Sequence, residues 1–356
     1  MNKEFWKNKK VLITGNTGFK GSWLSEILLR AGADVIGYAL QNEIRECIFN
    51  SISLEKEMEC VYGDICDEDL LARTVKRVRP DVVFHLAAQP LVRTSYKEPV
   101  YTYKTNVIGT VNLLNSLRSC ESVRAIVNVT TDKVYYNNGG PTLFKEDDRL
   151  GGYDPYSASK ACSEIVTESF VLSFFNPEKY GKDHNAAIAT ARAGNVIGGG
   201  DYSEDRIIPD CIRAVRSGKQ VVLRNPNANR PWQHVLEPLS FYIMLAEKLY
   251  SSGVKYNGAY NIGPEIKDCL TVVQIVNMIK KYIPDFEIVI ANDKAEGPHE
   301  SANLTLDTGK IREQFGFTNK WDIEKCIKNT AEWYRDQMFG ANMKNVTDKM
   351  IEDYFA

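Results

Sequence analysis

The segment that decides the fold is VLITGNTGFKG, residues 11–21, in which three glycines lie between an apolar run and a helix-like stretch. Gly15 permits a tight turn, Gly18 lets a pyrophosphate approach the backbone, and Gly21 allows the helix to pack closely. The free N–H groups at the start of such a helix favour an anion. The spacing is GxxGxxG rather than GxGxxG, and a glycine triplet alone also fits a plain strand-to-helix turn. Because a strand is expected before it and a helix after it, we predict that this turn binds a dinucleotide.

Short apolar runs alternate with helix-like stretches along the chain, which indicates crossover units and a parallel sheet. We therefore predict an α/β fold with a doubly wound, Rossmann-type parallel sheet. Strands are expected at residues 10–13, 34–38, 82–87, 125–130 and 187–192. Helices are expected at residues 19–30, 67–78, 99–117, 155–174 and 239–250, where apolar residues recur at three- and four-residue spacing.

The domain boundary has to be inferred, because the glycine and proline clusters at residues 139–141, 151–152, 198–200 and 225–226 mark loops rather than one linker. After Gly194 the regular alternation loosens. We predict a dinucleotide-binding domain made of residues 1–194 and 234–262. A second, smaller substrate-binding lobe would then comprise residues 195–233 and 263–356.

Composition excludes several classes of protein. The 356 residues include 44 Lys and Arg against 46 Asp and Glu, which lacks the basic excess that nucleic-acid binding requires. No apolar run of about 18 residues occurs, and residues 1–10 lack a signal-peptide stretch, so we expect a cytoplasmic protein that does not enter the membrane. The eight cysteines never form the close pairs of zinc sites and the four histidines lie far apart, so we expect reduced cysteines and no metal.

The residue that would bind the ribose of a dinucleotide is not evident from the second strand. Residues 38–41, Tyr-Ala-Leu-Gln, carry no carboxylate where NAD enzymes usually have one. Asp64 is a candidate for the adenine side of the site. It also fits the N-cap of the next helix, and both interpretations stay open.

A phenol and an ammonium are predicted on one helix face, at Tyr156 and Lys160, in the helix that Asp154 and Pro155 open. A phenol with a pKa of about 10 is a poor base at neutral pH, but a nearby Lys⁺ and a nicotinamide cation would favour its ionised form. Tyrosinate could then remove a hydroxyl proton. A surface Tyr and Lys that share helical spacing by chance is the plainer alternative.

The strand expected at residues 125–130 runs into two hydroxyls, an acid and a base, at Thr130, Thr131, Asp132 and Lys133. Ligands of open α/β sheets bind beyond the carboxyl ends of the strands, so these side chains should reach the same crevice as Tyr156. The two motifs together predict acid–base catalysis at this edge. Taken alone, residues 132–133 also fit a solvated turn.

The chain resembles the extended short-chain dehydrogenase/reductases, the NAD(P)-dependent family that acts on nucleotide sugars, from Phe5 to about Trp321. The segments that carry this resemblance are TGNTGFKGSW (14–23), HLAAQPLV (85–92), GGYDPYSASK (151–160), ARAGNVIGGGDY (191–202), NPNANRPWQHVLEPL (225–239) and GPHE (297–300). Residues 131–133 read Thr-Asp-Lys, as in the branch that acts on CDP-glucose, whereas the dTDP-glucose branch has Thr-Asp-Glu. Within the family, the chain is most similar to the CDP-glucose branch.

The resemblance implies an NAD-dependent dehydration of CDP-D-glucose to CDP-4-keto-6-deoxy-D-glucose in deoxysugar biosynthesis. Tyr156, positioned by Lys160 and Thr131, would take the proton of the C4 hydroxyl while hydride passes to NAD⁺. Lys133 would remove the C5 hydrogen, Asp132 would protonate the departing C6 hydroxyl, and hydride would return to C6. NAD is then regenerated in each cycle.

The resemblance also implies the binding residues. The expected NAD contacts are Gly15, Thr17, Gly18, Phe19, Asp64, Ile65, Ala87, Gln89, Asn106, Thr130, Tyr156 and Lys160. The expected nucleotide-sugar contacts are Asn195, Arg206, Arg230 and His299. An arginine fork can hold a diphosphate through two bonds, although Arg230, Arg206 and His299 also fit plain surface residues.

Family members are often dimers through two helices, here residues 99–117 and 155–174, so we expect a homodimer or homotetramer. Apolar stripes on those helices also suit an ordinary core. Two other functions stay open: a 4,6-dehydratase or 4-epimerase for another nucleotide sugar, and a dinucleotide-binding protein without catalysis. The sequence does not identify the residues that would select cytosine.

Overall fold

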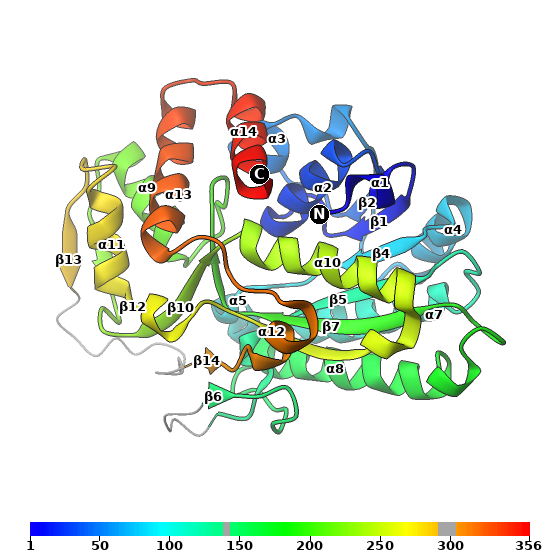
Figure 1. Cartoon of the computed structure of the whole chain (residues 1–356). Coiled ribbons are helices and arrows are strands. Elements are labelled where there is room, and N and C mark those ends of the chain that lie inside the picture. The colour runs from blue at the N-terminus through cyan, green and yellow to red at the C-terminus, as the bar shows by residue number, and fades with distance from the viewer. Residues whose placement is uncertain (138–142, 291–303) are drawn as a thin grey trace.

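The computed structural model describes residues 1–137, 143–290 and 304–356 (Figure 1). Its central sheet has seven strands in the order β11-β7-β5-β4-β1-β2-β3, and all neighbouring strands are parallel. The strands are β1 (Lys10–Thr14), β2 (Asp34–Ala39), β3 (Glu59–Tyr62), β4 (Val82–His85), β5 (Ala125–Thr131), β7 (Ala187–Ala193) and β11 (Gly258–Ile262). The chain winds outward from β1 in both directions, which confirms the predicted doubly wound sheet.

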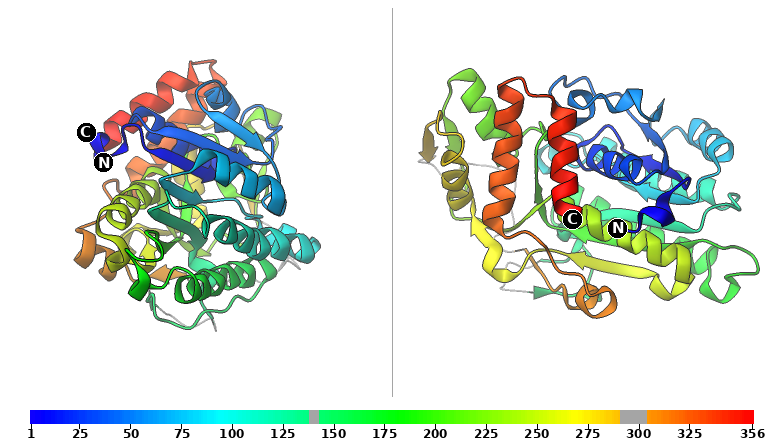
Figure 2. Two further views of the ribbon diagram at one scale, coloured as in Figure 1. Left: turned by 90° about the vertical axis from the view of Figure 1, so that its right-hand side faces the viewer. Right: turned by 45° about the horizontal axis from the view of Figure 1, so that its top comes forward.

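Helices cover both faces of this sheet because side chains alternate along each strand. Val11 and Ile13 of β1 pack on the face that α2 (Phe19–Arg30) and α10 (Leu236–Ser252) cover. Leu12 packs on the opposite face, against a cluster from α4 (Glu68–Val78), α7 (Gly109–Leu117) and α8 (Pro155–Ser173). The sheet is therefore buried between two layers of helices (Figure 2).

Two predicted helices differ from expectation. Residues 99–117 form α6 (Pro99–Tyr103), a π-helical turn (Lys104–Ile108) and α7 rather than one regular helix. Helix α10 begins at Leu236, before the predicted residue 239, because Pro238 lies in its first turn, where a missing N–H loses no helical hydrogen bond.

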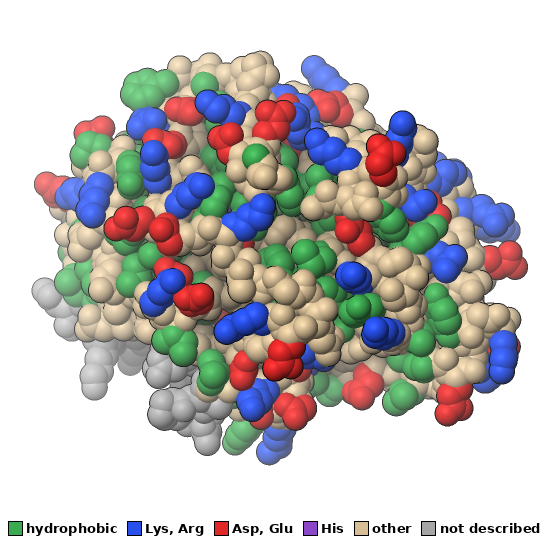
Figure 3. Space-filling view, viewed as in Figure 1, with side chains coloured by type: hydrophobic (Ala, Val, Ile, Leu, Met, Phe, Trp, Pro, Cys, Tyr) green, Lys and Arg blue, Asp and Glu red, His purple; other side chains and the backbone are tan. Residues whose placement is uncertain are grey.

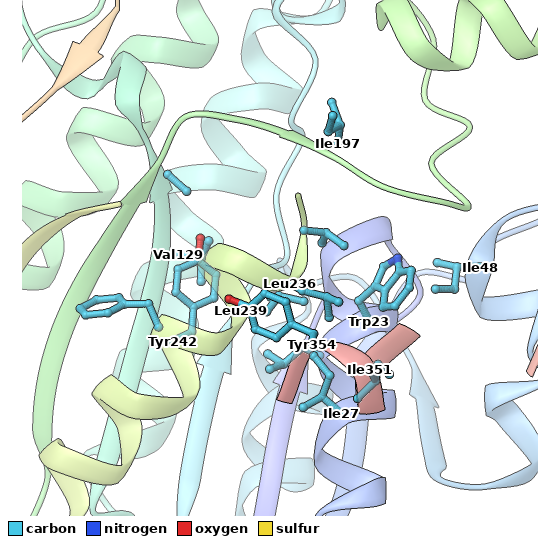
Figure 4. Close-up of a cluster of buried hydrophobic side chains, with 14 of the residues drawn as sticks. Trp23, Ile27, Ile48, Val129, Ile197, Leu236, Leu239, Tyr242, Ile351 and Tyr354 are labelled. Carbon is cyan, nitrogen blue, oxygen red and sulfur yellow. The ribbon is translucent and has the colours of Figure 1, made fainter. Parts of the chain in front are cut away.

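Helix α14 (Met343–Phe355) packs against α2, the helix that follows the glycine turn. In Figure 4, Ile351 and Tyr354 lie beside Ile27, in the cluster that also holds Trp23. Three ion pairs join the same helices: Lys344 Nζ is 2.6 Å from Glu26 Oε2, Arg30 Nη1 is 2.9 Å from Asp348 Oδ2, and Arg30 also pairs with Glu352. The end of the described chain thus covers the first crossover helix.

The remaining elements lie mostly beyond the carboxyl edge of the sheet. They are α9 (Ile207–Ser217), α11 (Val272–Lys280), α12 (Gly309–Phe315), α13 (Ile323–Met338), β8 (Asn195–Ile197), β9 (Val221–Leu223), β10 (Asn229–His234), β12 (Cys269–Thr271) and β13 (Ile288–Ile290), with the short pair β6 (Leu143–Phe144) and β14 (Thr305–Leu306). Strands β8, β10 and β12 form one small sheet, and β9 pairs with β13. The division into two domains at the predicted residues stays a prediction.

Three shorter α-helices are α1 (Lys3–Trp6), α3 (Ile48–Ser51) and α5 (Val92–Lys97). In the described part of the chain no helix is long and apolar enough to cross a membrane. The eight cysteines are free. On the face shown in Figure 3, basic and acidic side chains are interspersed, in keeping with the net charge of −2.

Candidate active site

The glycine turn has the geometry that a dinucleotide pyrophosphate needs. Gly15 has φ +77°, a conformation that L side chains rarely adopt, and a Cβ on Gly21 would lie 2.1 Å from the Gly15 carbonyl oxygen. No side chain caps α2 at Gly18, so the first N–H groups of Phe19 and its neighbours are left for an anion. Thr17 donates its hydroxyl hydrogen to the Leu40 carbonyl at 2.8 Å, which fixes the turn against the end of β2.

Asp64 is not the N-cap of the following helix. That position belongs to Asp67, whose side chain accepts from the Leu70 N–H at 2.9 Å. Asp64 accepts from the Cys66 N–H, and Tyr38 donates to its carbonyl oxygen. The helix-cap interpretation is therefore wrong. The adenine-side role of Asp64, and of the buried Ile65 beside it, stays a prediction.

The residues after β4 lie against the glycine turn. A Cβ on Gly15 would lie 2.7 Å from the Ala87 nitrogen. Asn106, in the π-helical turn, accepts from the Gln89 N–H at 2.8 Å and donates to the Gln89 carbonyl and to Ser159 Oγ. A π-helical turn often marks a functional site, and here it joins the turn after β4 to the helix that carries Tyr156.

Four of the predicted catalytic residues line one pocket of about 380 Å³: Thr131, Asp132, Lys133 and Tyr156. Thr131 ends β5 and donates to Asp132 Oδ1 at 2.9 Å. Asp132 is 2% exposed, and its Oδ2 has no hydrogen-bond partner among the described residues. The interpretation of residues 132–133 as a solvated turn is thus wrong for Asp132, whereas Lys133 is partly exposed.

Lys160 lies behind this pocket rather than in its lining. It is 4% exposed, and its ammonium donates to the Val129 carbonyl at 2.8 Å. Burial lowers the pKa of Lys160 to about 8, against the opposing charge of Glu164. Tyr156 and Lys160 are both buried, so the alternative of a chance pair on the surface is wrong.

The Tyr156 phenol is protonated in the protein alone. Burial raises its pKa to about 12, and the Asp132 carboxylate raises it further, while a hydrogen bond with the Thr131 side chain and the Arg206 charge lower it. A ligand cation beside the phenol would favour the ionised form. Tyr156 can therefore act as a base only when a bound ligand brings positive charge next to its phenol.

A buried ion pair supports the strand and helix that carry these groups. Glu164, one turn beyond Lys160 on α8, accepts from Arg192 Nε on both oxygens at 2.9 Å. The two side chains are 4% and 3% exposed. Thr130, a predicted NAD contact, donates to Glu164 Oε1 at 2.5 Å, so its hydroxyl is committed to this network.

Lys20 also lines the pocket, although it was not among the predicted site residues. Burial lowers its pKa to about 7, and the charges of Arg206 and Lys160 lower it while those of Asp132 and Asp201 raise it. No hydrogen bond or ion pair within 4 Å from the described residues holds its ammonium. The sequence placed Lys20 inside the glycine motif, which could have indicated a site residue. Its environment, however, includes Asp201, which is far away in the sequence.

The predicted substrate contacts lie at the same pocket, with one exception. Asn195, Arg206 and Arg230 line it. Arg206 donates to Asp201 at 2.8 Å, and Arg230 is 7% exposed, so the alternative of a plain surface arginine is wrong. His299 lies outside the described residues. The substrate roles of these residues stay predictions.

Known proteins resemble this chain over its whole length. The model of a family described as GDP-mannose 4,6 dehydratase matches residues 12–330. A CDP-glucose 4,6-dehydratase of Salmonella typhimurium is 43% identical over 100% of this chain and 99% of its own. A dTDP-glucose 4,6-dehydratase of Shigella flexneri is 26% identical over 91% of this chain and 92% of its own.

Solved structures share the fold. A dTDP-glucose 4,6-dehydratase of Bacillus anthracis in complex with NAD has a TM-score of 0.74 and 24% identity, covering 94% of this chain and 99% of its own. A UDP-glucose 4-epimerase of Thermotoga maritima with UDP-glucose has a TM-score of 0.78 and 24% identity, covering 92% and 99%. At these identities the likeness establishes the fold.

Proposed function

This chain belongs to the family described as GDP-mannose 4,6 dehydratase, and from that premise we propose that it is a hydro-lyase that converts CDP-D-glucose to CDP-4-keto-6-deoxy-D-glucose with bound NAD. The observation that carries the proposal is the presence of Thr131, Asp132, Lys133 and Tyr156 in the lining of one pocket. The choice of CDP-glucose rests on the 43% identical relative, which is described as a CDP-glucose 4,6-dehydratase.

The residues present fit NAD. The turn formed by Gly15, Gly18 and Gly21 can accept a pyrophosphate, and it needs glycine at position 21 because a Cβ there would collide with the Gly15 carbonyl. Bound NAD would supply the acceptor for a hydride from C4 and the donor of a hydride to C6. Thr17, Asp64, Gln89 and the other predicted contacts are proposed to hold the rest of the cofactor.

In the proposed reaction the protein moves three protons. Tyr156 takes the proton of the C4 hydroxyl. The hydrogen bond with the Thr131 side chain, and the positive charge of Lys160 one turn further along α8, would stabilise the phenolate. Lys133 removes the C5 hydrogen, which the new ketone has acidified. Asp132 protonates the leaving C6 hydroxyl, a role that its unpartnered Oδ2 leaves open. The released molecule is water, and the proton on Lys133 returns to C5. Tyr156 then gives up the proton it took and Asp132 regains one, by exchange with solvent, so the cycle closes.

Product analysis tests the proposal. The protein is incubated with CDP-, UDP-, dTDP- and GDP-glucose, and each product is identified by mass spectrometry. We expect loss of one water from CDP-glucose with no net formation of NADH. Release of NADH in equal amount to product, or dehydration of another nucleotide sugar in preference to CDP-glucose, would overturn it.

The Asp132→Asn variant separates the steps. It should still oxidise C4, because Tyr156 is intact, but it should lose water slowly, so NADH absorbance should appear and persist in a single turnover. Asp183→Asn, at an exposed carboxylate far from the pocket, is the matched control and should behave as the wild type. Equal rates of NADH formation and decay in both variants would contradict the assignment of Asp132.

We also propose that the chain forms a homodimer through the predicted helices. Exposed apolar side chains gather there, with Val100 67%, Ile108 48%, Ile165 53% and Leu172 60% exposed. These residues lie on α6, on the π-helical turn and on α8, which contact one another. Light scattering should give twice the chain mass, and Ile165→Glu should shift the protein toward monomer. A monomeric wild type would refute this interface.

A further inference from the structure

The pocket continues from the catalytic groups into the second lobe. Beyond the residues already described it is lined by Asp205, the start of α9, residues 222–225 and Val272. Figure 1 places α9 and β13, the partner strand of β9, at the far side of the molecule from β11 and α8. If the proposed function holds, the hexose lies at Tyr156 and the nucleotide occupies this far end of the pocket.

An ion pair stands in this far end. Arg224 Nη2 donates to Asp205 Oδ1 at 2.9 Å, and Arg93 Nη1 lies 3.4 Å from the same oxygen. The Arg224 and Asp205 side chains are 34% and 36% exposed. Among the described residues, no other hydrogen bond or ion pair involves Asp205 Oδ2 or the remaining Arg224 N–H groups. Asp205 also has φ +57°, a conformation that is uncommon outside glycine and concentrates at functional sites.

The pair presents an acceptor beside donors. Asp205 Oδ2 can accept a hydrogen bond, and the Arg224 N–H groups that no described residue uses can donate. Cytosine offers the complement: its N4 amino group donates, and its N3 and O2 accept. Guanine recognises cytosine with the same order of groups, one acceptor followed by two donors.

Uracil and thymine do not match this pattern. Their C4 carbonyl would face the Asp205 carboxylate, and their N3–H would face the Arg224 N–H groups, so both contacts would be repulsive. Carboxylates accept from the cytosine amino group in known base recognition. A site with buried polar groups discriminates strongly against a ligand that leaves those groups unpaired. An apolar pocket discriminates less between ligands that differ only in shape.

Two other arginine–aspartate pairs near the pocket are committed elsewhere. Arg213, the partner of Asp210, donates to the carbonyls of Tyr202 and Ser203. Asp201 holds Arg206 and both the N–H and hydroxyl of Ser203. Arg206 also acts on the charge of Tyr156, which places that pair at the catalytic end.

Apolar side chains flank the free pair. Ile207, Pro209, Val222 and Val272 line the same pocket, and each lies within a few positions of Asp205 or Arg224 or at the start of α11. Val222 is 55% exposed in the protein alone. These surfaces suit the faces of a flat pyrimidine ring, while the ion pair meets its edge.

We infer that Asp205 and Arg224 read the edge of the cytosine base and so select a CDP-sugar over its UDP and dTDP counterparts. Arg93 lies 3.4 Å from the same Asp205 oxygen that Arg224 contacts, and the two arginines together orient the carboxylate. This inference rests on the proposed function, because it takes the ligand to be a CDP-hexose.

Asp205→Asn tests the inference, because a side-chain amide can turn its NH₂ toward the uracil carbonyl. For wild type and variant, kcat/KM is measured with CDP-glucose and UDP-glucose, and the affinities of CDP and UDP are measured by calorimetry. We expect the cytosine-to-uracil ratio to fall by about 5- to 150-fold, the discrimination of one good base contact. Asp210→Asn is the matched control, since its carboxylate lines the same pocket and is also paired with an arginine, Arg213, and it should keep the wild-type ratio.

The outcomes separate the two proposals. A wild-type enzyme with no preference for CDP-glucose would overturn the choice of substrate. A wild-type enzyme that prefers CDP-glucose, with an Asp205→Asn ratio within about twofold of it in both measurements, would overturn the inference and leave the function intact. If the variant loses turnover with both sugars, the ratio of its CDP and UDP affinities from calorimetry tests the inference instead: a ratio within about twofold of the wild type would overturn it.

Discussion

Replacing Glu164 by glutamine should destabilise the protein more than any exposed charge change. Its carboxylate is the buried counter-ion of Arg192, and glutamine would leave that guanidinium charge unpaired among side chains that are 3–4% exposed. Breaking such a pair typically lowers the free energy of unfolding by about 3–5 kcal/mol. With 356 residues and an unfolding entropy of about 2.1 cal/mol/K per residue, the melting temperature should fall by about 4–7 °C.

Calorimetric melting of the wild type and Glu164→Gln is the assay, with Asp183→Asn as the control. Asp183 pairs with Lys179 at 3.4 Å, but both side chains are about 60% exposed, so this pair should contribute less than about 1 kcal/mol. If Glu164→Gln lowered the melting temperature no more than Asp183→Asn does, the reasoning would be refuted. In the double variant Glu164→Leu with Arg192→Met, part of the lost stability should return, because no unpaired charge remains.

Three further predictions concern the turn, the base and acid stability. Gly21→Ala should weaken NAD binding at least about tenfold in a fluorescence titration, because its Cβ would lie 2.1 Å from the Gly15 oxygen and displace the pyrophosphate cradle; unchanged affinity would contradict this. Tyr156→Phe should lower kcat for CDP-glucose by about 10²- to 10⁴-fold while NAD binding persists, and a rate within tenfold of wild type would exclude the phenol as base. Burial lowers the pKa of His85 and His234 to about 3, so the unfolded state binds more protons below about pH 6.5 and stability falls as the pH falls. Between pH 7 and 5.5 these two groups should remove about 2–3 kcal/mol, and His234→Gln should abolish about half of that change in urea unfolding.

The fold was predictable where the signal is local. Residues 11–21 combine a strand, a glycine turn and a helix within one segment, and β1 and α2 lie where they were expected. The central strands are continuous apolar runs because helices cover both faces, and such runs stand out in sequence. The π-helical turn at Asn106 could not be predicted, because its residues have ordinary helical propensity and the turn is set by packing against α8.

The site was predictable as motifs but not as a set of distances. Tyr156 and Lys160 share a helix, so their spacing is visible in sequence, but only the fold places Lys160 behind the pocket with its ammonium on the Val129 carbonyl. Lys20 was missed because its environment comes from residues near 132, 160 and 201. Arg224 and Asp205 lie 19 positions apart, one after β9 and the other before α9, and no local pattern pairs them.

The contact between α14 and α2 has a consequence for synthesis. Ile351 and Tyr354 leave the ribosome long after Trp23 and Ile27, whose apolar side chains they help to cover (Figure 4). Until then, the helix that follows the glycine turn exposes apolar surface that chaperones and neighbouring nascent chains can bind. A premature stop codon shortly before residue 343 would therefore leave apolar side chains uncovered near the other end of the polypeptide, in the first crossover unit.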